Sequence, residues 1–361
     1  MILLKPIEVV LVTYPDRFTL QEAKSLAESM TGWSVVKIFT QKYLNHAEYG
    51  VGSGKAHEIK EFLRQSPNVR YVIVDEQLTS KKLFNLEKLL GIKVIDRERL
   101  ILDIFYTRAT TNEAKLQIQL AEIKYEMPRV REIAKISAGN ERPGKGGSGE
   151  YEVDVKFRDL KRRMSFIKEK LAEAKSKRDL YHQQRKKAGM PIISLVGYTS
   201  AGKTTLFNLL TSEHKETSDS LFTTLSTTTR SMKVDERTTV LLIDTVGFVS
   251  RLPTYMIDAF KSTLEESLTA DLILLLIDSF EALQDIRIKY SSCWQVLEEL
   301  KVDRAKVLAV LTKYDNSTDA QKIDEIIKEL RLENPLVVSS NTGYGVHKLK
   351  TIIKQRSIPR E

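Results

Sequence analysis

Apolar residues in the first hundred positions form short runs that alternate with segments of helical spacing. The runs lie at Glu8 to Thr13, Val35 to Phe39, Tyr71 to Val74 and Lys93 to Ile95. The helical segments begin near Leu20, Ala56 and Ser80. Alternation of this kind favours a mostly parallel sheet, because parallel strands need a crossover connection between them. We therefore expect a small α/β domain over residues 1–100.

After residue 100 the apolar spacing changes to steps of three and four. Between Ile104 and Met127 one helical face carries Leu116, Leu120, Ile123 and Met127, and we expect Pro128 to perturb or end that helix. The glycine-rich run 139–149 predicts irregular structure. The segment from Val155 to Ala188 lacks Gly and Pro and has a coiled-coil-like seam at Leu160, Met164, Ile167, Leu171, Ala174 and Tyr181. These features predict a long antiparallel helical pair over residues 101–188.

From residue 189 onward, short apolar runs again alternate with helical stretches. The runs lie at 192–196, 239–243, 272–277, 307–311 and 336–338. The pattern predicts an α/β nucleotide-binding domain with a largely parallel sheet over residues 189–361.

Composition is that of an ordinary soluble chain. Its 361 residues are 42% hydrophobic and 29% charged. No apolar run approaches the roughly eighteen residues of a membrane span, and the run after Met1 is too short for a secretory signal. Cys293 is the only cysteine, which excludes an internal disulfide and a cysteine-rich metal site. We expect a cytoplasmic monomer with no membrane partner.

Positive charge is concentrated in one segment. The chain carries a formal +9, and between Tyr151 and Ala188 there are 13 Lys and Arg against 6 Asp and Glu, a net +7 (13 − 6). A solvated helix laced with salt bridges accounts for this excess. So does an electrostatic contact with an RNA backbone, which Arg142 and Lys145 would extend. Both interpretations stay open.

The stretch after the run 192–196 has the spacing of a phosphate-binding loop. It consists of Gly197, Tyr198, Thr199, Ser200, Ala201, Gly202, Lys203 and Thr204, and Thr205 follows in a predicted helix. A strand, a glycine loop and a helix N-terminus are the context that the motif requires. Backbone N–H groups would surround a phosphate, Lys203 would reach the β and γ phosphates, and Thr204 would ligate Mg²⁺.

A second motif follows the strand predicted at 239–243. Asp244 and Gly247 stand in the pattern Asp-x-x-Gly. Asp244 can hold Mg²⁺ through a water molecule, and Gly247 can offer its N–H to the γ-phosphate. Upstream, the threonine-rich segment Phe222 to Arg230 could supply one hydroxyl to the Mg²⁺ ion, although several threonines compete for that role.

A third motif indicates which base is bound. Thr312, Lys313 and Asp315 match a guanine-recognition pattern with Thr where Asn is usual. The Asp315 carboxylate would accept hydrogen bonds from N1–H and the exocyclic amine of guanine, a donor pair that adenine lacks. An aspartate that caps the next helix is the plainer alternative. The residues Ser339, Ser340 and Asn341 lie where a last loop could support the base.

With these motifs in place, the chain resembles the HflX family of ribosome-associated GTPases, and its last domain looks like a translation-factor-class GTPase. The resemblance rests on Phe222-Thr-Thr-Leu225, on Asp244-Thr-Val-Gly-Phe248 followed by Leu252-Pro253, on Tyr49 to Ile59, and on the helical pair with its glycine-rich loop. It covers nearly all of the chain.

The resemblance implies a GTPase that converts GTP to GDP on the large ribosomal subunit. It implies contact of the first domain and the helical pair with ribosomal RNA, and a role in ribosome splitting, rescue or quality control. It also implies that Thr224, with Thr223 as the second choice, is the Mg²⁺-binding threonine beside Thr204 and Asp244. Lys203, Thr224 and Gly247 then form the catalytic group.

Three positions depart from the family pattern. Ser200 stands where many relatives have Asn, a position linked to potassium-assisted hydrolysis in related GTPases. Thr312 replaces Asn, which would loosen the base pocket slightly. The sequence also reaches its last residue one helix after Asn341, so we expect no extra carboxy-terminal domain of the kind some bacterial members carry.

Phe248 lies where small GTPases carry a glutamine that orients the attacking water. A phenylalanine cannot do so by hydrogen bonding, so the sequence predicts slow intrinsic hydrolysis that the ribosome accelerates. Arg230 and Arg251 are candidates for an arginine finger only because they lie close in sequence to the threonine-rich segment and to the Asp-x-x-Gly motif. A GTP-dependent RNA- or protein-binding switch with incidental hydrolysis is the alternative function, and a P-loop ATPase is disfavoured by Asp315.

The segment Gly52-Ser-Gly-Lys55 in the first domain also precedes a predicted helix. It lacks the four-residue spacer and the hydroxyl residue of a phosphate loop, so a structural turn or an RNA-facing loop is favoured over a second nucleotide site. His57 and the other histidines show no metal-ligand spacing.

Overall fold

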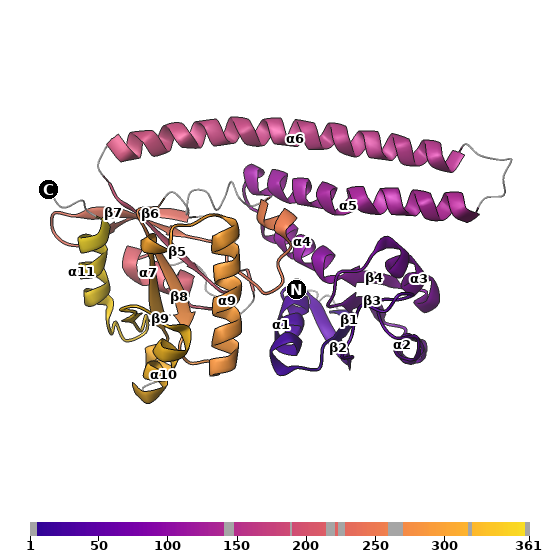
Figure 1. Ribbon diagram of the computed structural model, residues 1–361, viewed down its shortest axis with the longest axis horizontal. Helices are drawn as coiled ribbons and strands as arrows, with labels where there is room; N and C mark the ends of the chain where they lie inside the picture. Colours follow the sequence, from indigo (N-terminus) through magenta and orange to yellow (C-terminus); the bar gives the residue numbers. More distant parts are fainter. Residues whose placement is uncertain are drawn as a thin grey trace, which may run out of the picture. The chain divides into compact units, whose positions relative to one another are not determined.

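The computed structural model describes residues 6–140, 148–187, 190–213, 221–222, 228–258, 270–316 and 320–357. The chain divides into two compact units, Met1–Thr107 with Leu116–Leu171 and Arg108–Lys115 with Ala172–Glu361. Each unit contains a sheet of mainly parallel strands (Figure 1). The predicted α/β class is therefore confirmed.

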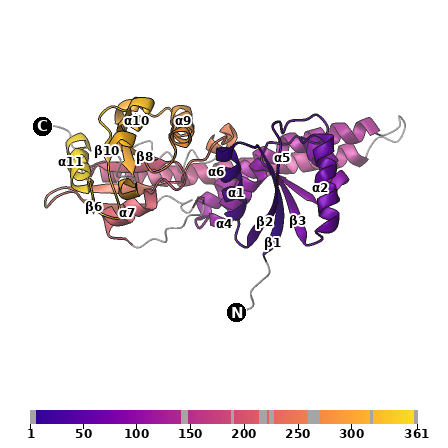
Figure 2. The ribbon, with the colours of Figure 1, turned by 90° about the horizontal axis from the view of Figure 1, so that it is seen from below.

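The first unit contains a four-stranded sheet in the order β2-β1-β3-β4, with every pair parallel. Figure 2 shows β1, β2 and β3 side by side. Strands and helices alternate along the chain as β1 (Ile7–Thr13), α1 (Arg17–Glu28), β2 (Trp33–Thr40), α2 (Ser53–Gln65), β3 (Val69–Val74), α3 (Ser80–Leu90), β4 (Lys93–Asp96) and α4 (Arg97–Arg108). The four predicted strands and the first three predicted helices are all present. Buried aliphatic side chains of β1, β3 and α2, among them Val10, Val72 and Ile59, form the core.

A buried ionic cluster fills the carboxyl ends of β1 and β3. This is the point where the strand order reverses, at which open α/β sheets commonly bind ligands. Arg97 donates from one nitrogen to Asp75 at 2.6 Å and from another to Glu22 at 2.7 Å, and the Thr13 hydroxyl donates to Asp75 at 2.8 Å. Burial alone would lower the pKa of Arg97, but the two carboxylates outweigh it and raise that pKa, so the side chain stays charged.

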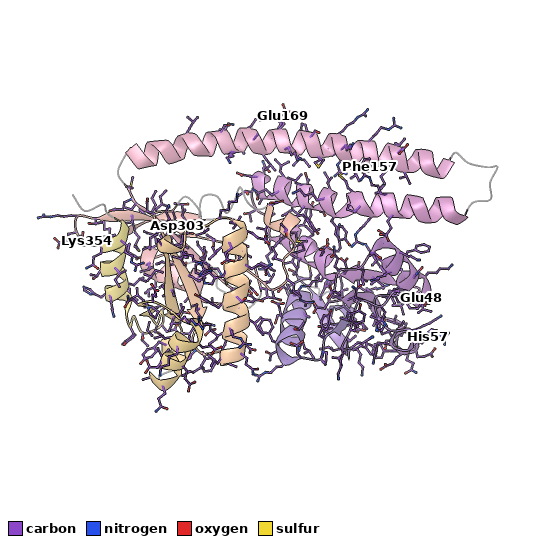
Figure 3. The ribbon with its side chains drawn as sticks, in the orientation of Figure 1. Glu48, His57, Phe157, Glu169, Asp303 and Lys354 are labelled. Atoms are coloured by element: carbon purple, nitrogen blue, oxygen red, sulfur yellow. The ribbon has the colours of Figure 1, made fainter. Side chains whose placement is uncertain are left out.

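The helical pair consists of α5 (Asn112–Asn140) and α6 (Ser148–Lys187). They run side by side in opposite directions (Figures 1 and 2), as predicted. Leu120, Ile123 and Val130 of α5 pack against Leu160 and Ile167 of α6. In Figure 3, Phe157 lies between the two helices, whereas Glu169 points away from α5. Four residues of the predicted seam, Leu160, Met164, Ile167 and Leu171, thus belong to the packed face of α6, and the side chain of Tyr181 lies outside the described part of the structure.

Two bounds of the helical prediction were wrong, and of the two effects expected at Pro128 an end of the helix is not found. The segment 104–127 is not one helix, because α4 ends at Arg108 and α5 begins at Asn112, where Thr111 accepts the Ala114 N–H at 3.1 Å. Pro128 lies inside α5 and does not end it. Helix α6 begins at Ser148, seven residues before Val155, so Gly149 is helical. Residues 141–147, including Arg142 and Lys145, lie outside the described residues.

Tertiary contacts explain how α5 continues through Pro128. On one side of the proline, Tyr125 donates to Asp96 at 3.0 Å. On the other, Arg129 donates to Asp96 at 2.6 Å and to the carbonyl of Leu78 at 2.8 Å. These bonds hold both flanking turns of α5 against the end of β4 and compensate for the backbone bond that a proline removes.

The second unit contains a six-stranded sheet in the order β10-β9-β8-β5-β7-β6. Its elements are β5 (Ile192–Gly197), α7 (Lys203–Thr211), β6 (Thr228–Lys233), β7 (Thr239–Asp244), β8 (Leu272–Asp278), α9 (Leu283–Glu299), β9 (Val307–Thr312), α10 (Ala320–Leu330), β10 (Leu336–Val337) and α11 (Val346–Ser357). All five predicted strands are present, and they pair with one another in parallel.

Strand β6 was not predicted. It pairs antiparallel with β7 at the edge of the sheet, from Thr228 opposite Asp244 to Lys233 opposite Thr239. Its sequence is polar because most of its side chains are only partly buried or exposed. The end of the threonine-rich segment is therefore a strand, and an edge strand of this kind lacks the apolar pattern on which the prediction relied.

Candidate nucleotide-binding site

The glycine loop connects β5 to α7 and turns sharply at three positions. Gly197 has φ +153°, and a Cβ there would lie 2.6 Å from the carbonyl oxygen of Leu276, so no other residue fits. Gly202, which precedes α7, has φ +84°, and Ser200 has φ +62°. Positive φ at a non-glycine residue suits Asn better than Ser, so Ser200 holds a conformation that a serine seldom adopts.

Lys203 is the first residue of α7, and its ammonium group folds back over the loop. Its Nζ donates to the carbonyl oxygens of Gly197 at 3.1 Å and Tyr198 at 2.7 Å. The side chain is buried, and this burial lowers the pKa of Lys203 to about 8 despite the nearby charge of Asp244. A buried cation of this kind gains from an anionic ligand such as a phosphate. Thr205 follows Lys203 by two positions within α7.

Two oxygen ligands suitable for a magnesium ion meet beside Lys203. The hydroxyl of Thr204 donates to Asp244 Oδ2 at 3.2 Å, and Asp244 is fully buried at the end of β7. A hydroxyl and a carboxylate are ligands that Mg²⁺ accepts, with phosphate oxygens and water completing its shell. Within the described ranges, no group of three or more His, Cys, Asp or Glu could hold a metal ion, so a cage built of protein ligands alone is not found there.

Gly247 lies against the glycine loop. A Cβ at this position would be 2.7 Å from Thr199 Cγ2 and 3.0 Å from Lys203 Nζ, so the chain needs glycine here. Phe248 forms a short parallel bridge with Tyr198, and its side chain is buried. The structure thus brings Gly247 to Lys203 and turns Phe248 into the protein.

The predicted base-recognition residues meet at the ends of β9 and β10. Asp315 accepts hydrogen bonds from Ser339 Oγ and Asn341 Nδ2, both at 2.7 Å, and the Ser339 bond is the main cause of its lowered pKa. Lys313, with φ +58°, forms an ion pair with Asp278 at 2.7 Å. Ser340 lies between Ser339 and Asn341 in the same loop.

Thr312 connects the base-recognition loop to the glycine loop. Its hydroxyl contacts the carbonyl oxygens of Ala201 at 2.9 Å and Ile277 at 3.1 Å. The side chain is buried and therefore links the two loops directly. Sequence reasoning missed Asp278, which is the last residue of the buried strand β8. Its position at the end of an apolar run was the signal that could have found it.

In the threonine-rich segment Phe222 to Arg230, Phe222 is buried with φ +59°, and residues 228–230 belong to β6. Thr223 and Thr224 lie outside the described residues. Arg230 pairs with Glu213 at 2.6 Å, and Arg251 has φ +52°.

The segment around Gly52 in the first unit begins α2, with Gly52 as the N-cap and Ser53 to Lys55 in the first turn of the helix. Its Gly52 N–H donates to Gln41 Oε1 at 3.1 Å, and Lys55 pairs with Glu58 at 2.5 Å. His57 contacts the carbonyl of Ser53 at 2.8 Å and lies at the surface in Figure 3. These contacts lie within or beside the first turns of α2.

Comparison with known proteins agrees with this geometry. Three family models match in succession: "GTP-binding GTPase N-terminal" over residues 17–106, "GTP-binding GTPase Middle Region" over 108–185 and "50S ribosome-binding GTPase" over 192–341. A crystal structure of the protein SsGBP with GDP has a TM-score of 0.55 at 26% identity and covers 97% of this chain and 98% of that one. Fold and site together define a P-loop GTPase.

Relatives identify the family. GTPase HflX of Methanocaldococcus jannaschii is 39% identical over 94% of this chain and 83% of its own length. GTPase HflX of Escherichia coli K12 is 36% identical over 94% of this chain and 79% of its own. The chain belongs to the HflX family of GTPases. Among the described residues, no helix combines the length and apolar character needed to span a bilayer.

Proposed function

We propose that this GTPase binds the large ribosomal subunit through its first domain and basic helices and acts in ribosome splitting, rescue or quality control. The observation that supports this most directly is the charge of α6. Between residues 153 and 177 it carries nine Lys and Arg against four Asp and Glu, on a helix with one face packed against α5. Such an exposed cationic face suits an RNA backbone.

The nucleotide is proposed to bind across the glycine loop, with Lys203 and the N–H of Gly247 at the γ-phosphate. Thr204, Asp244 and a threonine at 224, or at 223 as second choice, would hold Mg²⁺, which supplies positive charge to the phosphates. Asp315 would recognise guanine, supported by Ser339 and Asn341. The Thr204 to Asp244 contact supports this assignment.

We further propose that the protein is a cytoplasmic monomer. Its three-part organisation, with boundaries at residues 100 and 188, remains a prediction. The match to the model described as "50S ribosome-binding GTPase" supports the choice of the large subunit as partner.

Co-sedimentation of the full chain with purified large subunits tests the proposal. We expect pelleting with GTP or a non-hydrolysable analogue and markedly less with GDP. The triple variant Arg162→Gln, Lys168→Gln, Lys177→Gln removes three exposed cations of α6 and should pellet at least tenfold less, since each phosphate contact contributes separately.

A matched variant makes the test specific. Lys328→Gln, Lys348→Gln, Arg356→Gln removes three exposed cations from α10 and α11, with the same change in net charge. It should pellet like the unmodified protein. Equal losses in both triple variants, or pelleting that ignores the nucleotide, would contradict the proposal.

A further inference from the structure

The segment that follows β7 is buried against the glycine loop. We call residues 245–250 the switch loop, and all six of them are buried. At its start, the Thr245 hydroxyl donates to the carbonyl of Leu195 in β5 at 2.7 Å. A loop of buried residues must have its backbone groups paired within the protein, so its bonding partners determine where it lies.

Two backbone bonds join the switch loop to the glycine loop. The N–H of Phe248 donates to the carbonyl of Gly197 at 3.1 Å, and the N–H of Thr199 donates to the carbonyl of Phe248 at 2.8 Å. The N–H of Ser250, two residues after Phe248, bonds to a side chain instead. It donates to the hydroxyl oxygen of Tyr198 at 2.7 Å.

Tyr198 is itself held firmly. Its side chain is 4% exposed, and Lys289 Nζ of α9 lies 5.1 Å from the centre of its ring. Together with Ile286 and Cys293 of α9, it lines a cavity behind the glycine loop. The ring is thus fixed between the sheet and α9, and its hydroxyl presents a fixed acceptor to the switch loop.

Gly247 lies between these bonds. It is one residue before Phe248 and three before Ser250, and a Cβ on it would lie 3.0 Å from Lys203 Nζ. The position of Gly247 beside the lysine therefore depends on the bonds that hold the switch loop on its far side.

We propose that Tyr198 is a positioning residue that fixes Gly247 beside Lys203 through the N–H of Ser250, and thereby favours GTP over GDP. This inference rests on the proposed function, in which Gly247 and Lys203 both contact the γ-phosphate. GDP lacks that phosphate, so placement of Gly247 affects GTP alone. The Tyr198 hydroxyl, on the glycine loop, thus affects the preference for GTP over GDP by positioning a loop about fifty residues later in the chain.

The variant Tyr198→Phe removes one oxygen atom and keeps the ring in its pocket. The buried Ser250 N–H then loses its acceptor, which disfavours the docked switch loop. We expect the affinity for GTPγS to fall about tenfold while the affinity for GDP changes less than twofold, measured with Mg²⁺ by competition against a fluorescent GDP. Loss of both affinities together would indicate a damaged glycine loop and would overturn the inference.

Hydrogen exchange gives a second readout that is independent of turnover. In the GTPγS-bound full chain, the amides of Phe248 and Ser250 should exchange at least fivefold faster in Tyr198→Phe than in the unmodified protein. Tyr290→Phe is the matched control, because Tyr290 lines the same cavity from α9. It should leave the affinity ratio and the exchange rates unchanged.

Other outcomes count against the inference. An unchanged GTPγS to GDP ratio in Tyr198→Phe would overturn the role of Tyr198 and leave nucleotide binding intact. A rise in the ratio of GTPγS affinity to GDP affinity would mean that the hydroxyl holds the switch loop in a position that disfavours GTP, which is the opposite role. Failure of the unmodified protein to bind GTPγS would instead overturn the proposed function, and the inference with it.

Discussion

At the scale of single residues, the ionisation of Lys203 links the protein interior to nucleotide binding. Burial lowers its pKa to about 8, so above that pH the side chain is mostly neutral unless an anion is bound. A phosphate favours the charged form, and binding above pH 8 must therefore take up a proton.

This linkage predicts a pH dependence of affinity. Because the fraction of protonated Lys203 falls as pH rises through 8, the affinity for GDP should drop about sevenfold between pH 7.0 and pH 8.8. Calorimetry at pH 8.5 in two buffers of different ionisation enthalpy should show uptake of about three quarters of a proton per nucleotide. An affinity that stays constant over this range would contradict the pKa.

Asp315 is the second residue with a clear test. In Asp315→Asn, an amide replaces a carboxylate that would accept two hydrogen bonds from guanine, and the amide can instead donate to the 2-oxo group of xanthine. We expect the affinity for GDP to fall about a hundredfold, which corresponds to about 3 kcal/mol, and the affinity for XDP to rise.

Competition of the two diphosphates against a fluorescent nucleotide measures this shift. Asp324→Asn, an exposed position on α10, is the control for the change in charge. If Asp315→Asn retains its preference for GDP, then Asp315 does not recognise the base.

At the scale of secondary-structure elements, the sequence predicted those strands and helices that contain buried apolar runs. Nine strands and the helical seam follow from such runs. Strand β6 could not be found this way because it is a polar edge strand, and the break before Asn112 depends on a cap at Thr111. That α5 continues through Pro128 could not be predicted, because the bonds from Tyr125 and Arg129 to Asp96 join residues 29 and 33 positions apart, which no local pattern reveals. The contact between Ser250 and Tyr198 escaped prediction for the same reason.

The attachment of α5 to β4 gives a prediction at this scale. Arg129→Gln removes a charge partner from the buried Asp96 and should destabilise the docked α5 by about 3 kcal/mol. Hydrogen exchange of amides between Leu116 and Arg131 in the full chain should then be about a hundredfold faster.

A neighbouring arginine supplies the comparison for that variant. Arg131 lies 4.3 Å from the centre of the Phe157 ring and is exposed, so Arg131→Gln should change exchange only slightly. Similar exchange in both variants would mean that the Asp96 contact does not hold α5.

At the scale of the whole molecule, catalysis and partner binding are expected to depend on each other. Phe248 is buried against the glycine loop and has no polar atom to orient water. Single-turnover hydrolysis by the purified chain should therefore be slow, and saturating large subunits should accelerate it at least tenfold.

Hydrolysis that is equally fast without subunits would refute this dependence. Nucleotide-dependent binding without any acceleration of hydrolysis would instead indicate a switch whose turnover is incidental. The two measurements together thus distinguish a GTPase whose hydrolysis is stimulated by its partner from a GTP-dependent binding switch.

The ionic cluster around Arg97 has a consequence for how the two sheets differ. Both sheets are mainly parallel, and open sheets of this kind commonly bind small molecules in the crevice at the carboxyl ends of their strands. In the first unit this crevice is filled by the chain itself, since Arg97 occupies it with Asp75 and Glu22 as permanent counter-ions. Arginine here takes the place that a cationic ligand would hold in another protein. At this edge the first sheet is therefore held together by its own buried ion pairs, and a small cation would have to displace Arg97 to bind there.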